Sequence, residues 1–455
     1  MKRKVLEGSV LFASILKWLF LASGVGIVVG FSTTIFLKLL VMGISYASQF
    51  NYYYLLLPFA LFFSSTIVQY LAPDAVGHGT EKIIEAVHKY SGRIKPLVVP
   101  VKLVATIITI TCGGSAGKEG PAAQIGAGAC SSFADLLRFN NRDRRKLVIC
   151  GISAGFATVF GTPIAGAIFG VEVLFVGGLL YEVLFPSFVA GIVGYQISSS
   201  LGISYFHEPL QFVPVFSSLF FIKVCLGGLF FGMVCFLFIE TLRLFEEASK
   251  RIRLWNPLKG FAGGIALILL TLAFSSRYLG LGLDTIKGSL ENAPIPAGAF
   301  ILKMVFTAIT LSFGGSGGII TPIFFVGATA GNTFASVLGF DPAIFAAIGL
   351  VSVLAGAANT PISASIMSVE LFGAAVAPYA AVSCIISFLM TGHRSVYPSQ
   401  ILSVAKSSSL VVAQGKEMGE IGDVAYRPKP ESLAGRIIRR MRKAKSDERP
   451  EESDE

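Results

Sequence analysis

The sequence predicts an all-α, polytopic membrane protein built from two repeated halves, in which several helices are broken. Its 455 residues are 53% hydrophobic and only 14% charged, with a mean hydropathy of +0.72. This composition excludes a soluble globular protein. Apolar segments long enough to cross a bilayer recur along the chain, whereas a β-barrel would show short alternating segments. Two glycine-rich blocks each recur in the same order, which indicates a duplicated half.

The apolar segments predict the membrane helices, each needing about 20 mostly apolar residues to span. The opening "MKRKVLEGSVLFASILKWLF" resembles a signal peptide, but its apolar run continues past residue 30 without a convincing cleavage site. We therefore expect a retained first span. The clearest helical segments are residues 9–40, 53–71, 147–175, 209–239, 260–274 and 343–371.

Basic clusters predict which loops face the cytoplasm, because such loops carry an excess of Lys and Arg. The clusters are "RFNNRDRRK" at 138–146, "KRIRLWNPLK" at 250–259 and the C-terminal "RIIRRMRKAK". They account for much of the formal net charge of +10. The basic balance therefore does not require a nucleic-acid partner.

The change in composition near residue 405 predicts two regions. Residues 1–405 are expected to form a transmembrane domain in the cell membrane, with halves at roughly 15–200 and 211–402. Residues 406–455 are expected to form a mobile, charged, cytoplasmic tail. Its basic stretch either rests on anionic lipid or is solvated.

The cysteines and histidines give no support for a metal site or a cofactor. All six cysteines lie in apolar segments, where buried thiols behave as small hydrophobic groups. The four histidines form no tight cluster with them. A membrane-embedded enzyme would need a nucleophile with a base, or a metal cluster, and neither spacing occurs. We expect no enzymatic activity.

Two blocks of the chain repeat in register. "GGSAGKEGPAAQIGAGACSSF" at 113–133 aligns without gaps on "GGSGGIITPIFFVGATAGNTF" at 314–334. Residues 151–172 likewise align on 349–370, and in each a Thr-Pro pair is followed nine residues after the proline by a glutamate. Composition alone could make glycine-rich helices similar, but it would not preserve this proline and glutamate spacing. Transporters commonly place their site where such broken segments of two halves meet.

The stretch "GGSAGKEGP" has the features of a helix start aimed into the protein. Glycine permits close backbone approach and proline suits the first turn. Helix N-termini present free N–H groups and partial positive charge, so they attract anions. Glu119 within this stretch is a functional candidate, because ionisable residues are costly in a membrane. The alternative is that Glu119 caps the helix or pairs with Lys118.

These residues resemble the CLC family of chloride channels and proton-coupled anion antiporters. "GKEGP" at 117–121 matches the family's G-(K/R)-E-G-P signature, and "GIITP" at 318–322 resembles its G-x-F-x-P motif. "GHGTE" at 77–81 is similar to a displaced G-S-G-I-P, and Tyr397 resembles the tyrosine near the end of the membrane domain. The likeness covers roughly residues 15–405. It implies an α-helical inverted repeat with many tilted and broken helices, and a homodimer with one pathway per subunit.

The resemblance also implies roles for single residues. Glu119 would be the gate, blocking the pathway when ionised and opening it when protonated or displaced. Tyr397 would offer its hydroxyl to the anion, although it could instead belong to an interfacial aromatic belt. The residues expected to bind the anion are His78, Gly117, Lys118, Gly120, Gly318, Ile319, Ile320 and Tyr397.

The chain departs from the family pattern at three points. His78 replaces a serine that faces the anion, unless it is only a loop residue, and Ile320 replaces a phenylalanine. Val173 stands where antiporters hold an internal glutamate that relays protons, which favours a channel without excluding coupling through water or another acid. The neighbouring Glu172, like Glu370 in the other half, is expected to be a structural helix-end acid.

The sequence therefore predicts transport of chloride or a similar small anion through a pathway gated by Glu119, either passive or coupled to protons. "TPIFFVGATAGN" is similar to the fluoride-transporting branch of the family, so a fluoride/proton antiporter is the main alternative. That branch usually lacks the proline kept here as Pro121. An unrelated secondary transporter with broken helices is the remaining alternative.

Overall fold

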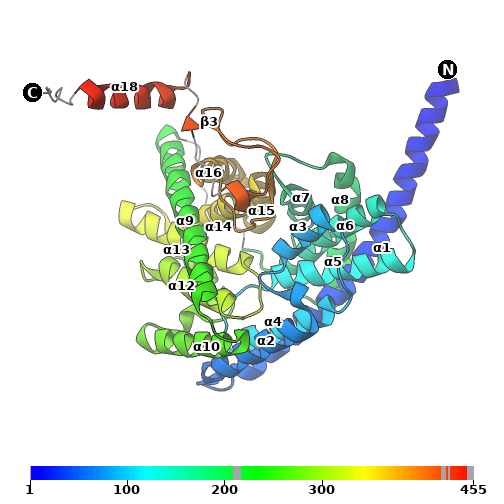
Figure 1. The fold of residues 1–455 in the computed structure, drawn as a ribbon, viewed down its shortest axis with the longest axis horizontal. Helices are drawn as coiled ribbons and strands as arrows, with labels where there is room; N and C mark the ends of the chain where they lie inside the picture. Colours follow the sequence, from blue (N-terminus) through cyan, green and yellow to red (C-terminus); the bar gives the residue numbers. More distant parts are fainter. Residues whose placement is uncertain (1, 209–216, 422–426, 429–430, 448–455) are drawn as a thin grey trace, which may run out of the picture.

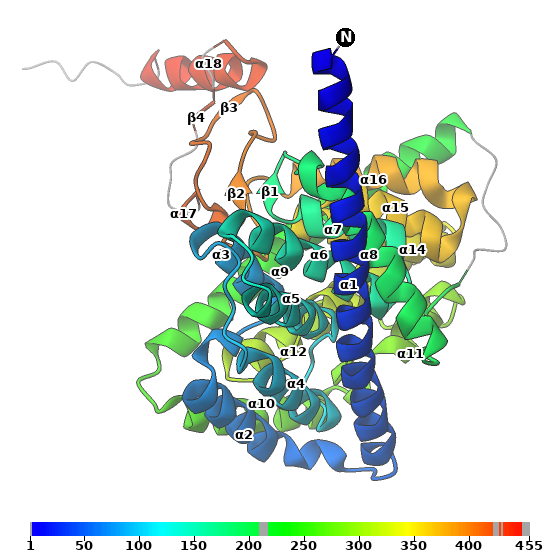
Figure 2. The same cartoon turned by 90° about the vertical axis from the view of Figure 1, so that its right-hand side faces the viewer.

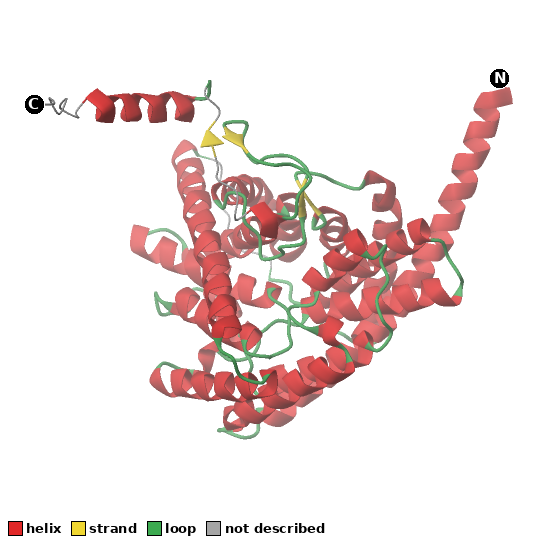
Figure 3. Ribbon diagram, viewed as in Figure 1, coloured by secondary structure: helices red, strands yellow, loops and turns green. Residues whose placement is uncertain are grey.

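Helices dominate the computed structural model, which describes residues 2–208, 217–421, 427–428 and 431–447 (Figures 1 and 3). Within this part of the chain, six helices are long and apolar enough to cross a membrane. Shorter apolar helices lie between them in both halves. The expected all-α membrane architecture is confirmed.

The first half runs from the N-terminus to residue 200. Its helices are α1 (Lys2–Ala47), η1 (Tyr53–Leu56), α2 (Leu57–Leu71), η2 (Pro73–Ala75), α3 (Thr80–Lys89), α4 (Val98–Thr111), α5 (Glu119–Leu136), α6 (Asn141–Phe160), α7 (Pro163–Glu172) and α8 (Tyr181–Ser200). The second half repeats this order of long, short and broken helices. It comprises α9 (Ser218–Arg251), α10 (Asn256–Ala273), η3 (Ser276–Tyr278), α11 (Leu283–Leu290), α12 (Ala299–Ser312), α13 (Ile320–Leu338), α14 (Pro342–Ala358), α15 (Pro361–Phe372), η4 (Ala374–Val376) and α16 (Ala377–Met390).

Two of the segments predicted as continuous, 147–175 and 343–371, are each split into two helices. Gly161 ends α6 with a φ of 71°, and Asn359 ends α14 with a φ of 57°. A residue in the left-handed conformation ends a helix, and the proline that follows in each half opens the next one. The breaks therefore occur at equivalent points of the repeat.

The segment predicted at 209–239 corresponds to α9, which continues twelve residues further, to Arg251. Residues 209–216 of that segment lie outside the described residues. The side chain of Ser217 caps the start of α9 by accepting the N–H of Phe220.

The two halves meet through reciprocal helix caps. The carboxylate of Glu172 at the end of α7 accepts two backbone N–H groups near the start of α15, at 3.0 and 2.8 Å. The carboxylate of Glu370 near the end of α15 accepts the equivalent pair near the start of α7, at 3.0 and 2.8 Å. The donors are Ile362, Ser363, Ile164 and Ala165. Mutual capping requires antiparallel helices, so these two equivalent helices run in opposite directions, which agrees with the inverted repeat that the family resemblance implies.

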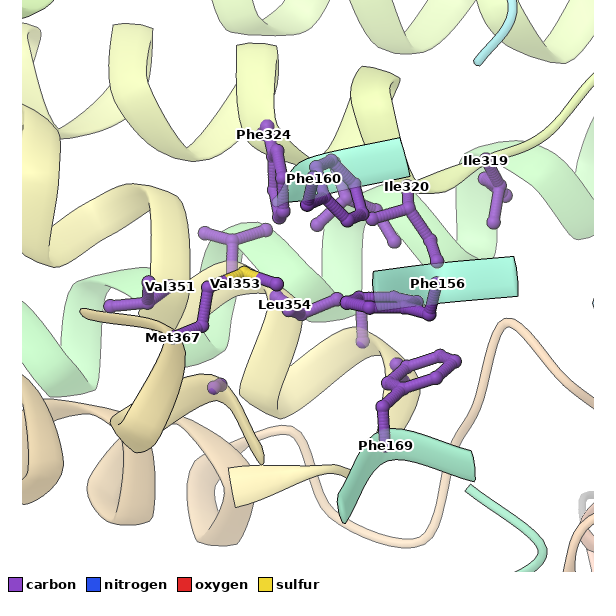
Figure 4. Packing of buried hydrophobic residues seen from close by; sticks show 14 of the residues in the cluster. Phe156, Phe160, Phe169, Ile319, Ile320, Phe324, Val351, Val353, Leu354 and Met367 are labelled. Atoms are coloured by element: carbon purple, nitrogen blue, oxygen red, sulfur yellow. The ribbon is translucent and has the colours of Figure 1, made fainter. Parts of the chain in front are cut away.

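Aromatic residues of the core connect the two halves next to the start of α13. Phe156 and Phe169 stack with ring centroids 4.1 Å apart, and Phe160 of α6 packs on Phe324 of α13 at 4.9 Å. Figure 4 shows these rings beside Ile320, the first residue of α13. Close packing of this kind holds the helix starts in fixed positions.

Short strands fasten the segment after α16 to the first half. β1 (Phe175–Val176) pairs in parallel with β2 (Ile401–Leu402), and β3 (Leu410–Val411) pairs antiparallel with β4 (Arg427–Pro428). The buried side chains of α17 (Met418–Ile421) pack on this edge. The last helix, α18 (Leu433–Asp447), lies apart from the helical body in both views (Figures 1 and 2).

Candidate functional site

The starts of α5 and α13 meet at the centre of the molecule. The N–H of Gly117 donates to the carbonyl of Gly318 at 2.7 Å, and the N–H of Gly318 donates back to Gly117 at 2.6 Å. A Cβ on Gly318 would lie only 2.7 Å from the backbone nitrogen of Gly120. Only glycine permits this approach. Two helix N-termini, one from each half, thus concentrate partial positive charge at one place.

Glu119 connects the two helix starts. Its carboxylate accepts the backbone N–H of Thr321 at 3.1 Å and a short hydrogen bond from the Thr321 hydroxyl. The side chain is buried, with 1% of its surface exposed. Lys118 lies beside it, half-buried, but the two bonds come from the opposite half. The carboxylate therefore occupies donors of the kind that bind anions.

His78 and Tyr397 lie together on another side of this centre. Their ring centroids are 5.7 Å apart. Among the described residues, neither His78 Nδ1 nor the Tyr397 hydroxyl has a hydrogen-bond partner of standard geometry, although Thr80 lies close to the hydroxyl. Buried polar groups normally find partners, so such atoms mark positions where water or an ion can bind.

The loop carrying His78 lies directly against the start of α5. A Cβ on Gly120 would lie 1.9 Å from the His78 carbonyl oxygen. The buried ammonium of Lys102 holds the same loop, donating to the carbonyls of Ala75 (3.1 Å) and Gly77 (2.6 Å). The structure therefore brings three predicted segments, around 78, 119 and 318, into contact.

Lys102 has a counterpart in the second half that the sequence analysis did not single out. Lys303 donates to the carbonyls of Tyr278 at 3.1 Å and Gly280 at 2.8 Å. Both lysines are fully buried. The signal was a lysine within an otherwise apolar helix of each half, α4 and α12. A buried ammonium needs such acceptors to offset its desolvation.

Gln400 positions Tyr397 and was also not predicted. Its side-chain amide donates to the carbonyls of Val173 and Ala358, both at 2.8 Å. Its oxygen accepts the hydroxyl of Ser395 at 2.6 Å, and Ser395 in turn accepts the N–H of Tyr397 at 2.9 Å. Gln400 is fully buried. This network fixes the backbone on both sides of the tyrosine.

The remaining predicted residues surround the same centre. Ile319 and Ile320 are buried at the start of α13. Val173 is buried directly after α7 and contributes its carbonyl to Gln400. Glu172 caps α15, which is the structural role expected for it.

Comparison with known proteins adds a family and several relatives. Residues 59–392 match the family profile described as voltage gated chloride channel. The chain is 36% identical over 399 residues to the chloride/fluoride channel protein of Pseudomonas syringae pv. tomato, covering 86% of this chain and 88% of that protein. It is 28% identical over 313 residues to the voltage-gated ClC-type chloride channel ClcB of Shigella flexneri, covering 65% and 74%.

Two solved structures have the same fold. The crystal structure of a CLC-type fluoride/proton antiporter superposes with a TM-score of 0.81 at 30% identity, covering 85% of this chain and 98% of that chain. A slow cyanobacterial Cl⁻/H⁺ antiporter superposes with a TM-score of 0.73 at 21% identity, covering 82% and 94%. The second likeness supports the fold alone.

Proposed function

Because this chain belongs to the CLC family of voltage-gated chloride channels, we propose that it moves small anions across a membrane along a pathway gated by Glu119. The observation that carries this proposal is the bonding of the Glu119 carboxylate to Thr321. A negatively charged side chain from one half occupies donors at a helix start of the other half. An anion entering the site would compete for these donors.

Protonation of Glu119 is the proposed opening step. An ionised carboxylate is held by the N–H and hydroxyl of Thr321 and by the partial positive charge of the α13 start. A protonated carboxyl has no net charge, so it binds these groups less strongly and can yield them to an anion. The groups proposed to surround the anion are the backbones of Gly117, Gly120, Gly318, Ile319 and Ile320 and the side chains of Lys118, His78 and Tyr397. Gly117 and Gly318 are proposed to shape the site, because their N–H groups already donate to each other's carbonyl oxygens.

We propose that fluoride is the preferred anion and that protons are exchanged for it. The chloride/fluoride channel protein and the fluoride/proton antiporter, each at least 30% identical to this chain, both support this choice. Fluoride is a strong hydrogen-bond acceptor, which suits a site of N–H and hydroxyl donors. A passive channel is the second candidate function, because Val173 is apolar at the proton-relay position.

We infer that the basic segments at 138–146 and 250–259 and the tail after residue 405 face the cytoplasm, with the chain in the cell membrane. Their excess of Lys and Arg supports this orientation. We also infer a homodimer. Apolar side chains that face outward on α15 and α16, including Ile362, Ile385 and Leu389, supply a surface for a second subunit or for lipid.

The test is ion flux from proteoliposomes loaded with fluoride or chloride, with external pH recorded and valinomycin setting the voltage. The wild-type chain is expected to release fluoride faster than chloride and to drive protons uphill. Glu119→Gln is expected to keep anion flux and lose proton movement, whereas Glu246→Gln, at an exposed ion pair on α9, changes neither. If the Glu119→Gln variant moves protons as fast as the wild type, Glu119 is not the coupling residue. If fluoride and chloride leave at equal rates, the proposed fluoride preference is wrong.

A further inference from the structure

Glu81 is a second carboxylate beside the pathway, in the first turn of α3. Its Oε1 accepts the backbone N–H of Ser399 at 3.0 Å and the Ser399 hydroxyl at 2.5 Å. Its Oε2 is buried and has no hydrogen-bond partner among the described residues. One carboxyl oxygen is therefore saturated, and the other is the oxygen at which a proton can bind.

The position of Glu81 connects it to the gate. Gly79, which precedes α3, packs so tightly on the start of α5 that a Cβ there would lie 2.5 Å from the Gly120 carbonyl oxygen. Glu119 immediately precedes Gly120. Glu81 also bonds to Ser399, two residues after Tyr397, and the Tyr397 ring lies 5.7 Å from that of His78. The same loop and the same tyrosine segment therefore connect the surroundings of Glu81 to those of Glu119.

The charged groups around Glu81 leave its proton exchange possible. On α3 itself, Lys82 pairs with Glu85 at 2.8 Å rather than with Glu81. From α6, Arg145 donates to the carbonyl of Val87 at the other end of α3. The packed segment after α16 presents the neutral Tyr397 and Ser399. Part of Glu81 is exposed although Oε2 itself is buried, so water can approach the residue.

We propose that Glu81 takes up protons from the side of α3 and passes them toward Glu119, replacing the internal acid that the chain lacks at Val173. A proton from water forms an O–H bond at Oε2, and the water that donated it loses the same bond. When the proton leaves, the O–H bond at Oε2 breaks and a new O–H bond forms on the accepting water or on the Glu119 carboxylate. This inference rests on the proton-coupled transport proposed above.

The environment of the carboxyl group supports such a role. α3 is polar and is not among the helices that are long and apolar enough to cross a membrane. Burial raises the pKa of Glu81 to about 7, against the opposing effect of the two bonds from Ser399. A group that titrates near neutral pH can both accept and release a proton under ordinary conditions.

A purely structural role for Glu81, as an anchor for Ser399 and hence for Tyr397, makes a different prediction. Glu81→Gln keeps an oxygen that accepts both Ser399 bonds but cannot carry a proton. If Glu81 relays protons, this variant is expected to retain anion flux and to lose proton flux by about a hundredfold. Glu246→Gln, which removes a carboxylate from an exposed ion pair on α9, is the control and is expected to change neither flux.

The measurement uses the full chain in proteoliposomes and records anion efflux and external pH together. Proton flux through Glu81→Gln equal to that of the wild type would overturn the proposal while leaving anion transport intact. Loss of both fluxes from a folded variant would assign Glu81 an anchoring role and would also overturn it. If the wild-type chain carries anions without moving protons, both the relay and the proposed antiport are wrong, whereas the proposed anion pathway still stands.

If Glu81→Gln does not fold, Ser399→Ala provides the second test. It leaves the carboxyl group in place and removes the hydroxyl that stabilises its charged form. Protonation then becomes easier, so the pH profile of proton flux is expected to move to higher pH. An unchanged profile in this variant would count against Glu81 as the proton-binding group.

Discussion

At the level of a single residue, Thr321 holds the carboxylate of Glu119, the proposed gate. Thr321 donates its hydroxyl and its backbone N–H to that carboxylate, 202 positions earlier in the chain. Hydrogen bonds to a charged group contribute about 1.5–3 kcal/mol. A change confined to the hydroxyl therefore alters the closed state without removing the gate itself.

Thr321→Val is expected to open the pathway more often. The substitution keeps the branched shape but removes one donor, so at a pH where Glu119 is ionised, anion flux is expected to rise by about tenfold or more. Thr321→Ser keeps the hydroxyl and is the matched control. Flux measured across a pH series decides the point, and equal rates for the two variants at high pH would show that the hydroxyl does not hold the gate.

Single residues also show how far the sequence could predict the site. Glu119, His78 and Tyr397 could be proposed because they lie in short motifs that resemble those of the family, and the structure brings their segments together. Thr321, Gln400 and Ser399 were not, because their roles depend on contacts between segments far apart in the chain. A buried threonine in an apolar helix has no local feature that distinguishes a gate contact from packing.

At the scale of helices, the reciprocal caps of α7 and α15 fix how the two halves meet. Each carboxylate accepts two backbone N–H groups that would otherwise be unpaired at a helix start. Glu172→Ala and Glu370→Ala are each expected to destabilise the fold by about 1–3 kcal/mol and to lower the midpoint of thermal unfolding.

Thermal unfolding in detergent, followed by the loss of the monodisperse peak in size-exclusion chromatography, measures this effect. Glu246→Ala, which removes only an exposed pair with Lys250 on α9, is expected to leave the midpoint unchanged. Midpoints for both cap variants as high as that of Glu246→Ala would mean that the caps do not stabilise the junction.

Helix boundaries were harder to predict than helix content. Segments 147–175 and 343–371 are apolar on both sides of their breaks, so hydropathy alone predicts a single helix for each. Proline gives no sure signal, because Pro163 and Pro361 open helices whereas Pro186 lies inside α8 without ending it. The left-handed residues before the breaks, Gly161 and Asn359, are decided by tertiary packing.

At the scale of the whole molecule, the duplicated blocks predicted two related halves but left their relative direction open. Two sets of contacts show that equivalent segments run in opposite directions where the halves meet: the mutual caps of Glu172 and Glu370, and the antiparallel bridge between Gly117 and Gly318. Composition could not reveal either, because each contact joins residues about two hundred positions apart. The proposed pathway therefore depends on contacts between the two halves.

Gly318→Ala is expected to disturb the contact between the starts of α5 and α13. The new methyl group would lie 2.7 Å from the Gly120 nitrogen and 3.2 Å from the Gly117 carbonyl oxygen, both backbone atoms that cannot turn aside. The start of α5 must then move away, which breaks the two hydrogen bonds of the bridge and shifts Glu119 from Thr321. Overpacking of this kind costs about 1–3 kcal/mol.

We expect Gly318→Ala to lower anion flux in proteoliposomes by about tenfold or more, because the donors of both halves no longer converge. Gly24→Ala in α1 is the matched control: a methyl group there meets no atom within 4 Å, and alanine favours a helix. Its flux is expected to equal that of the wild type. If the Gly318→Ala chain transports as fast as the Gly24→Ala chain, the pathway does not depend on close contact between the two helix starts, and the anion site must lie elsewhere.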